Sequence, residues 1–198
     1  DLQTGEVLKR YFGHESLKPG QSEVIGRVMN LSNTLAVLPT GGGKSLCYQL
    51  PAMCMQGLSI VISPLIALMR DQVESLTKKG LPCARLDSTS SAEEIEQAMA
   101  SIGSGELKLL YLSPERLAEP SMLRLLKESH IALVAIDEAH CISEWGHDFR
   151  PDYLNLATIV KAFPDVPVTA FTATATHRVQ EDVIAKLGLR SPHLVRAS

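Results

Sequence analysis

Two adjacent acidic residues, Asp137 and Glu138, follow an uninterrupted apolar run at residues 132–136. A run without alternation is typical of a strand buried on both faces, and open α/β sheets bind ligands at the carboxyl ends of such strands. There an Asp can hold Mg²⁺, and a Glu can polarise the water that attacks a γ-phosphate. We therefore predict Asp137 as the Mg²⁺ residue and Glu138 as the general base. Taken alone, the pair favours the alternative that it only caps a helix.

A glycine-rich turn between a second apolar run, residues 34–38, and an apolar helix from Leu46 indicates a phosphate-binding loop. Glycines let backbone N–H groups converge on phosphate oxygens, and the helix N-terminus adds its positive dipole end. Lys44 should reach the β and γ phosphates, and Ser45 should ligate Mg²⁺. Leu38 replaces the first glycine of the strict pattern, so a merely flexible turn is the alternative; the acidic pair downstream favours ATP or GTP binding. The turn residues predicted to bind nucleotide are Thr40, Gly41, Gly42, Gly43, Lys44 and Ser45.

Gln21 lies upstream of this turn, in the segment Leu17-Lys18-Pro19-Gly20-Gln21. A Gln side chain carries both a donor and an acceptor, which match the N6 amino group and N7 of adenine. Gln21 is therefore a candidate adenine reader. The alternative is an ordinary solvated residue beside a Pro-Gly turn.

Along nearly its whole length, the chain resembles the first RecA-like lobe of the RecQ family of DNA helicases, within helicase superfamily 2. Besides the two motifs above, the resemblance rests on residues 46–52, 63–72, 111–117, 170–176 and the Trp-Gly-His-Asp-Phe-Arg-Pro segment at 145–151. This last segment is the most family-specific, because other superfamily 2 members share the acidic box without it.

The resemblance implies that residues 1–198 form the N-terminal ATP-binding lobe of an ATP-dependent DNA helicase of DNA repair and recombination, which unwinds with 3'-5' polarity and uses ATP and Mg²⁺. The implied partners are single-stranded or duplex-junction DNA and a second RecA-like lobe. That lobe and a cysteine zinc module, which relatives carry after it, are not expected in this chain.

The resemblance also implies that side chains at positions 14 and 18 sandwich the adenine. This chain has His14 where the family usually has Tyr, and Lys18 where it usually has Arg. An imidazole can still stack, but Lys lacks the planar guanidinium. Glu144, where the family often has Gln, adds negative charge beside the loop expected to touch DNA.

Apolar runs alternate with helical patterns throughout the chain. This alternation predicts an α/β fold of the RecA-like, P-loop NTPase type: a doubly wound, mainly parallel sheet with helices on both faces. Strands are expected near 34–38, 59–63, 108–112, 132–136 and 167–172, with weaker ones near 83–86 and 193–196. Helices are expected near 20–30, 45–56, 65–79, 91–102, 120–128, 152–162 and 175–187.

Residues 145–150 combine two aromatic side chains with His and Arg in a polar segment. Stacking of bases on aromatic rings contributes ~1–3 kcal/mol per base and tolerates any sequence, which suits a translocating motor. We predict that Trp145, His147, Phe149 and Arg150 contact DNA and couple it to the acidic pair; core packing of the aromatics is the alternative.

Three further residues are candidates for coupling nucleotide to DNA. Thr172 and Thr174 should hydrogen-bond to the acidic strand, although Thr is also simply a good strand residue. His140 should connect the acidic box to the second lobe, although a lone His is often only structural.

The composition is that of an ordinary soluble domain, with 45% hydrophobic and 21% charged residues in 198. The net charge of −3 means that DNA contact must be local or come from other parts of the protein. Four cysteines without paired spacing predict buried free thiols and no zinc. Without a membrane span or signal peptide, we expect an intracellular protein, in the cytoplasm (nucleoid) of a bacterium or the nucleus of a eukaryote.

Two other functions fit these residues. One is a different superfamily 2 motor, such as an RNA helicase or a double-strand translocase. The other is a nucleotide-binding module or fragment without turnover, because a helicase of this type takes an arginine finger from a second lobe.

Overall fold

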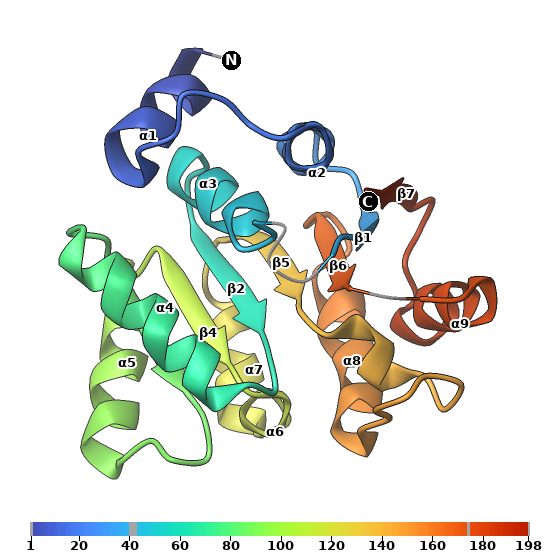
Figure 1. Cartoon of the computed structure of the whole chain (residues 1–198). Coiled ribbons are helices and arrows are strands. Elements are labelled where there is room, and N and C mark those ends of the chain that lie inside the picture. The colour runs from blue at the N-terminus through green and yellow to red at the C-terminus, as the bar shows by residue number, and fades with distance from the viewer. Residues whose placement is uncertain (1, 40–42, 174, 198) are drawn as a thin grey trace.

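The computed structural model describes residues 2–39, 43–173 and 175–197, and it contains a seven-stranded sheet in the order β3-β4-β2-β5-β6-β1-β7. Every strand pair is parallel, and the helices lie on both sides of the sheet (Figure 1). The expected doubly wound fold is therefore confirmed, including its two weaker strands. The strands are β1 (Thr34–Val37), β2 (Leu58–Ile62), β3 (Cys83–Leu86), β4 (Leu109–Leu112), β5 (Ile131–Ile136), β6 (Val168–Thr172) and β7 (His193–Arg196).

Two hydrophobic clusters, one on each face of the sheet, form the core. Neighbouring residues of one strand point to opposite faces: Tyr111 packs in one cluster and Leu112 in the other. The first face is covered by α1 (Leu2–Phe12), α2 (Pro19–Met29), α3 (Leu46–Cys54) and α4 (Ile66–Lys78). The second is covered by α5 (Ala92–Ser104), α6 (Pro114–Leu117), α7 (Pro120–Lys127), α8 (Leu156–Ala162) and α9 (His177–Leu187).

Helix α1 was not expected from the sequence. Gly5 lies in its first half, and its first turn has no acidic residue, so the sequence signal for this helix is weak. The helix is held by tertiary packing, because Leu8 is buried in the cluster on the α3 side. The helix expected at 152–162 also differs, since its first part is the 3-10 helix η2 (Pro151–Asn155).

The cysteines are free, as predicted, but only two of the four are buried. Cys47 and Cys141 are enclosed, and burial raises the pKa of each thiol to about 12. Cys54 ends α3 and Cys83 opens the edge strand β3, which leaves both partly exposed and corrects the expectation for these two. No helix in the described ranges combines the length and apolar character that a bilayer crossing requires.

Candidate functional site

The acidic pair lies at the carboxyl end of β5, at the centre of the sheet. The backbone N–H of Asp137 donates to the Ile62 carbonyl at 2.8 Å, which extends the pairing of β5 with β2 by one residue. Asp137 is 2% exposed. Glu138 has the left-handed backbone conformation, with φ of 51°, which is uncommon for a residue other than glycine. A short 3-10 helix, η1 (Ala139–Ile142), follows. Asp137 Oδ1 accepts from the Glu138 N–H at 3.0 Å, so the alternative that Asp137 caps this helix stays open beside its contact with Lys44.

Lys44 brings the phosphate-binding turn to these carboxylates. Its Nζ lies 3.1 Å from Asp137 Oδ1 and 3.8 Å from Glu138 Oε1, and its side chain is 18% exposed. Lys44 precedes α3, and Asp137 follows β5, so parallel strands bring together the two halves of the predicted site. Of the other turn residues, Thr40, Gly41 and Gly42 lie outside the described residues, as does Thr174.

Gly43 is favoured by its backbone conformation, and it lies against the end of the Gln21 side chain. Its φ of 75° is left-handed, and a Cβ at this position would lie 2.1 Å from Gln21 Nε2. The Gly43 carbonyl accepts hydrogen bonds from the Leu46 N–H at 3.2 Å and from Gln21 Nε2 at 3.0 Å. Gln21 thus anchors the turn whose position decides where Lys44 points.

The residues around Lys44 fit a Mg²⁺ ion. Two carboxylates already hold a cationic group, the Lys44 ammonium, and Ser45 stands at the N-cap of α3. Carboxylate and hydroxyl oxygens are the hard donors that Mg²⁺ prefers. Asp137 and Ser45 are the residues that would hold the ion.

The candidate adenine site adjoins Gln21. A hollow of about 500 Å³ is lined by Lys18, Gln21, Leu38 and Pro39 among others, and it does not include His14. Besides its bond to Gly43, Gln21 accepts through Oε1 from the Lys18 N–H at 2.9 Å. An amide has two N–H donors and two acceptor lone pairs, so one of each stays available for a base. His14, predicted to stack on the adenine, is exposed and outside this hollow.

Replacing Gln21 by Ala should reduce the preference for ATP over GTP by roughly 1 kcal/mol, about fivefold, because one hydrogen bond to the base is lost. Calorimetric titration of both nucleotides measures this. Gln56→Ala, at a position remote from the turn, is the matched control. Equal discrimination by the parent chain and the Gln21 variant would remove Gln21 from base recognition and leave it as an anchor of the turn.

Tyr153 contacts the backbone of the acidic pair, and this residue was not predicted from the sequence. Its buried hydroxyl donates to the Asp137 carbonyl at 2.8 Å from η2. Burial holds the pKa of this phenol far above its usual range, so the hydroxyl stays protonated and can donate. The bond helps hold the chain where it leaves β5 and enters the left-handed Glu138.

Tyr153→Phe should lower the free energy of unfolding by about 1–3 kcal/mol, since the Asp137 carbonyl loses its partner in a buried place. Denaturant melts measure the loss. Tyr11→Phe is the control, because Tyr11 lies on α1 and is only partly buried. A variant as stable as the parent chain would show that another donor replaces the phenol.

His140 links the acidic pair to the end of β6. Its Nδ1 lies 2.8 Å from Thr172 Oγ1, and its Nε2 lies 3.5 Å from Glu138 Oε2. Thr172 was expected to bond to the acidic strand, and this stays a prediction; one of its bonds goes to His140 in η1, just beyond that strand. Burial lowers the pKa of His140 against the opposing effect of Glu138, so the ring is neutral near pH 7. The contact of His140 with a second lobe stays a prediction.

The segment of residues 143–150, which we call the aromatic loop, connects directly to this His. The His147 ring stacks on His140, with centroids 4.6 Å apart. Trp145 is 59% exposed, which excludes core packing for this ring. Phe149 and Arg150 are partly buried, and Arg150 pairs with Asp148 at 3.2 Å. The four predicted DNA residues therefore occupy one loop beside the acidic pair.

Helix α9 holds the aromatic loop through two residues one turn apart, which sequence reasoning also missed. The Arg178 guanidinium carbon lies 3.5 Å from the centre of the Trp145 ring. Asp182 accepts a hydrogen bond from the Ser143 hydroxyl at 2.7 Å, and Ser143 Oγ in turn accepts from the Trp145 N–H at 3.1 Å. One face of the indole is thus covered by a cation, which is a favourable contact.

The sheet is parallel, and its glycine-rich turn places Lys44 opposite the Asp137-Glu138 pair at the carboxyl ends of the strands. This arrangement defines a P-loop NTPase. The family model for the DEAD/DEAH box helicase matches residues 18–183, and the chain belongs to this family. Within it, the chain is 48% identical over 187 residues to the ATP-dependent DNA helicase RecQ of Haemophilus influenzae and 46% identical over 191 residues to that of Bacillus subtilis. These alignments cover 94% and 96% of this chain.

The chain spans about a third of the length of these curated relatives, 30% and 32% respectively. Solved structures agree on the fold. The helicase MrfA bound to DNA has a TM-score of 0.75 at 17% identity, covering all of this chain and 29% of that one. The yeast DEAD-box splicing factor Prp28 has a TM-score of 0.74 at 20% identity, covering all of this chain and 50% of that one.

Proposed function

We propose that this chain is the ATP-binding and ATP-hydrolysing lobe of an ATP-dependent DNA helicase of the RecQ type. The observation that carries the proposal is the meeting of Lys44 with Asp137 and Glu138, at 3.1 and 3.8 Å. Family membership gives the reaction class, and the relatives named as ATP-dependent DNA helicases support DNA as the substrate. Repair and recombination, with 3'-5' unwinding, are the roles that the resemblance implies.

The residues of the site divide the reaction among them. The Lys44 ammonium pairs with both carboxylates and is placed to bind the β and γ phosphates of ATP. Asp137 and Ser45 would hold Mg²⁺, which when bound would neutralise charge on the phosphates. Glu138 then orients the attacking water and takes its proton, while neutral His140 beside it keeps the carboxylate in place.

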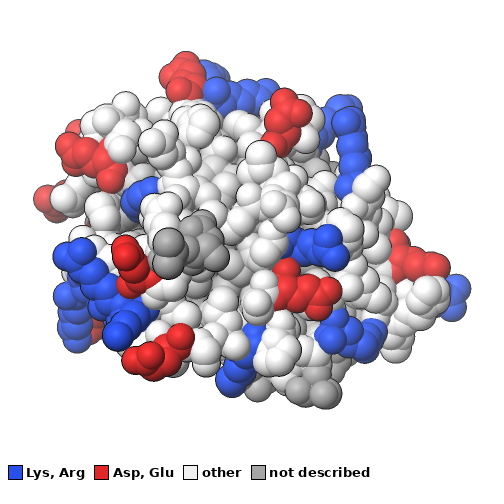
Figure 2. All heavy atoms as spheres, turned by 90° about the horizontal axis from the view of Figure 1, so that it is seen from above, with Lys and Arg blue, Asp and Glu red and all other residues white. Residues whose placement is uncertain are grey.

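DNA would be sensed at the carboxyl edge of the sheet. The aromatic loop leaves η1 at this edge, and the starts of α4 and α6 follow β2 and β4 there as well. The chain has a net charge of −3, and Figure 2 shows acidic and basic side chains interspersed over the face seen from above, the side of α1, α2 and α3 in Figure 1. Stacking on Trp145 is therefore a better candidate for the main contact than general charge attraction.

The proposal predicts an incomplete enzyme. An arginine finger raises the turnover rate of phosphoryl transfer ~10³–10⁵-fold. We propose that a second lobe supplies this arginine. The chain alone should bind ATP, hydrolyse it very slowly and unwind no DNA. Nucleotide titration, a phosphate-release assay and a strand-separation assay test this together. Robust unwinding by the purified chain would contradict the one-lobe proposal.

A different superfamily 2 motor is the second candidate. The aromatic ring of Trp145 does not distinguish DNA from RNA, because every base has a stacking face. Comparing the binding of DNA and RNA strands of equal length and sequence to the chain separates the two. A clear preference for RNA would favour the second candidate.

A further inference from the structure

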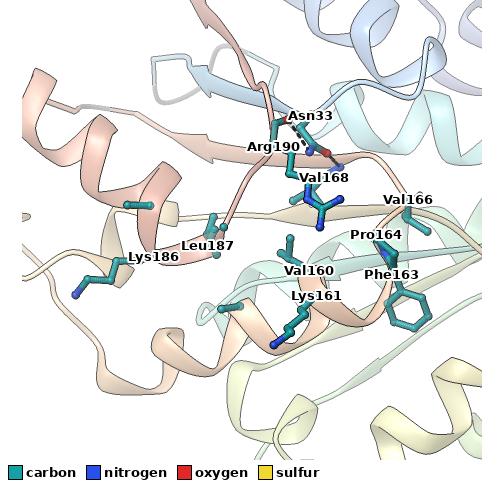
Figure 3. A pocket seen from close by; sticks show the side chains of 13 residues that line it. Asn33, Val160, Lys161, Phe163, Pro164, Val166, Val168, Lys186, Leu187 and Arg190 are labelled. Atoms are coloured by element: carbon teal, nitrogen blue, oxygen red, sulfur yellow. Dashed lines mark hydrogen bonds between the residues drawn. The ribbon is translucent and has the colours of Figure 1, made fainter.

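A hollow of about 350 Å³ lies at the amino edge of the sheet, where the chain enters its strands. The carboxyl-terminal ends of α8 and α9 form its sides, and Asn33 and Val168, at the starts of β1 and β6, form its back wall (Figure 3). Asp137 and Lys44 lie at the opposite edge, where strands end. A ligand in this hollow would therefore not compete with nucleotide or with DNA at the aromatic loop.

Asn33 makes the back wall of the hollow rigid. Its Nδ2 donates to the Arg190 carbonyl at 3.1 Å, and its Oδ1 accepts from the Val168 N–H at 2.9 Å. The Asn33 carbonyl also accepts from the His193 N–H at 2.9 Å. One amide thus ties β1, β6 and the segment before β7 together, so the hollow exists before any ligand arrives.

The hollow combines an aliphatic floor with cations. Val160, Val168 and Leu187 are buried residues of its lining, and Phe163 forms one wall. The charged lining residues are Lys161, Lys186 and Arg190, with no carboxylate among them. None of the three forms an ion pair within the described part of the chain.

Of the three cations, Arg190 is the one whose charge is not accounted for by a helix dipole. Lys161 and Lys186 stand in the last turns of α8 and α9, where a positive charge also offsets the helix dipole. Arg190 lies beyond the end of α9, and its guanidinium extends between Val168 and Val160 over the floor, whereas Lys186 points away (Figure 3). A guanidinium beside an apolar floor can bind a ligand that carries both a carboxylate, for the guanidinium, and an apolar group, for the floor.

We propose that this hollow docks a segment of a partner protein in which a large apolar side chain is flanked by carboxylates. The apolar side chain occupies the floor, and the carboxylates pair with Arg190 and Lys161. Nucleic acid fits less well, because the floor of Val160, Val168 and Leu187 is aliphatic and offers no hydrogen-bond partner to a base edge, whereas it suits an apolar side chain.

A fluorescent peptide, Asp-Asp-Asp-Phe-Asp-Asp-Asp, is the probe, measured by anisotropy with the chain at low ionic strength. The Arg190→Glu and Lys161→Glu variants should each weaken binding roughly fivefold or more, since a pair becomes a repulsion. Replacing the peptide's Phe by Ala should weaken binding roughly tenfold. Lys127→Glu, an exposed lysine of α7 outside the hollow, should change nothing. ATP affinity should be the same in all variants.

Several outcomes would overturn the proposal. They are absence of peptide binding to the parent chain, equal weakening by Lys127→Glu, and indifference to the peptide's Phe, which would mean charge attraction alone. A single-stranded oligonucleotide that binds with the same dependence on Arg190 and Lys161 would assign the hollow to nucleic acid instead. Thermal melts show that each variant is folded, and Arg190→Gln removes the charge without reversing it.

Discussion

Lys44→Ala should lower ATP affinity on the order of a hundredfold, because each charge-assisted bond to a phosphate contributes ~1.5–3 kcal/mol and Lys44 is placed to make more than one. The ion pairs of Lys44 add a second expectation. Lys44 faces Asp137 and Glu138 at 3.1 and 3.8 Å, so its loss leaves the buried Asp137 with no ion-pair partner among the described residues. The free energy of unfolding should fall by about 2 kcal/mol, less than for a fully enclosed pair.

Calorimetry with ATP and denaturant melts without it measure the two effects separately. Lys78→Ala is the matched control, since Lys78 forms an exposed ion pair with Glu74 at 3.3 Å and should change neither quantity measurably. Lys44→Arg keeps the positive charge. It should restore the free energy of unfolding more fully than the ATP affinity, because a guanidinium is larger than the ammonium that the phosphate-binding turn accommodates. ATP affinity unchanged in Lys44→Ala would contradict the assignment of the phosphate site.

Trp145→Ala should weaken binding of single-stranded DNA by ~1–3 kcal/mol, roughly fivefold to over a hundredfold, because it removes a base-stacking ring. Stability should change little, since the ring is 59% exposed. Trp145 is the single tryptophan of the chain, so its fluorescence reports on this ring alone. Adding an oligonucleotide to the parent chain should quench it as a base stacks on the indole.

Arg178→Ala tests whether the covered face of the indole is used. Removing the guanidinium 3.5 Å from the ring centre frees a second face for a base, so the quenching should increase at saturating DNA. Leu194→Ala, at an exposed apolar position on β7, is the control and should leave the titration unchanged. Fluorescence indifferent to DNA, together with full DNA affinity in Trp145→Ala, would show that the ring is not a stacking platform.

In the longer protein that we propose, loss of Trp145 or Phe149 should leave DNA-free hydrolysis near normal while sharply reducing hydrolysis stimulated by DNA. The structure supplies the connection, through the stacked pair of His147 and His140 and the 3.5 Å contact from His140 to Glu138. Rates measured with and without DNA check this. Equal loss of both rates, with a large fall in melting temperature, would instead identify a structural role for the ring.

The strands and the nucleotide site could be predicted from the sequence because their signals are local. Uninterrupted apolar runs mark β1 and β5, and parallel topology then places whatever follows those strands at one edge. The proximity of Lys44 and Asp137 follows from this topology alone. The same holds for the aromatic loop, which follows the acidic pair by only a few residues.

The supporting contacts could not be predicted, because each joins elements that no sequence spacing relates. Tyr153 reads as one more apolar residue of a helix, and nothing in the chain connects Arg178 or Asp182 with the loop thirty-odd residues before them. The adenine-stacking role of His14 came from its position in a motif alone. It stays a prediction, because His14 is not among the residues that line the hollow beside Gln21.

The position of β1 in the sheet has a consequence for how the chain folds. This strand, which leads into the phosphate-binding turn, pairs with β6 and β7, with Thr34 opposite both Thr169 and His193. Both neighbours lie far downstream of β1 in the sequence, so during synthesis β1 must wait until Val168–Thr172 or His193–Arg196 has emerged before it has a strand partner. Contacts so distant along the chain form slowly. Refolding should therefore restore helical signal before ATP binding, and the nucleotide site should be the last part of the molecule to mature.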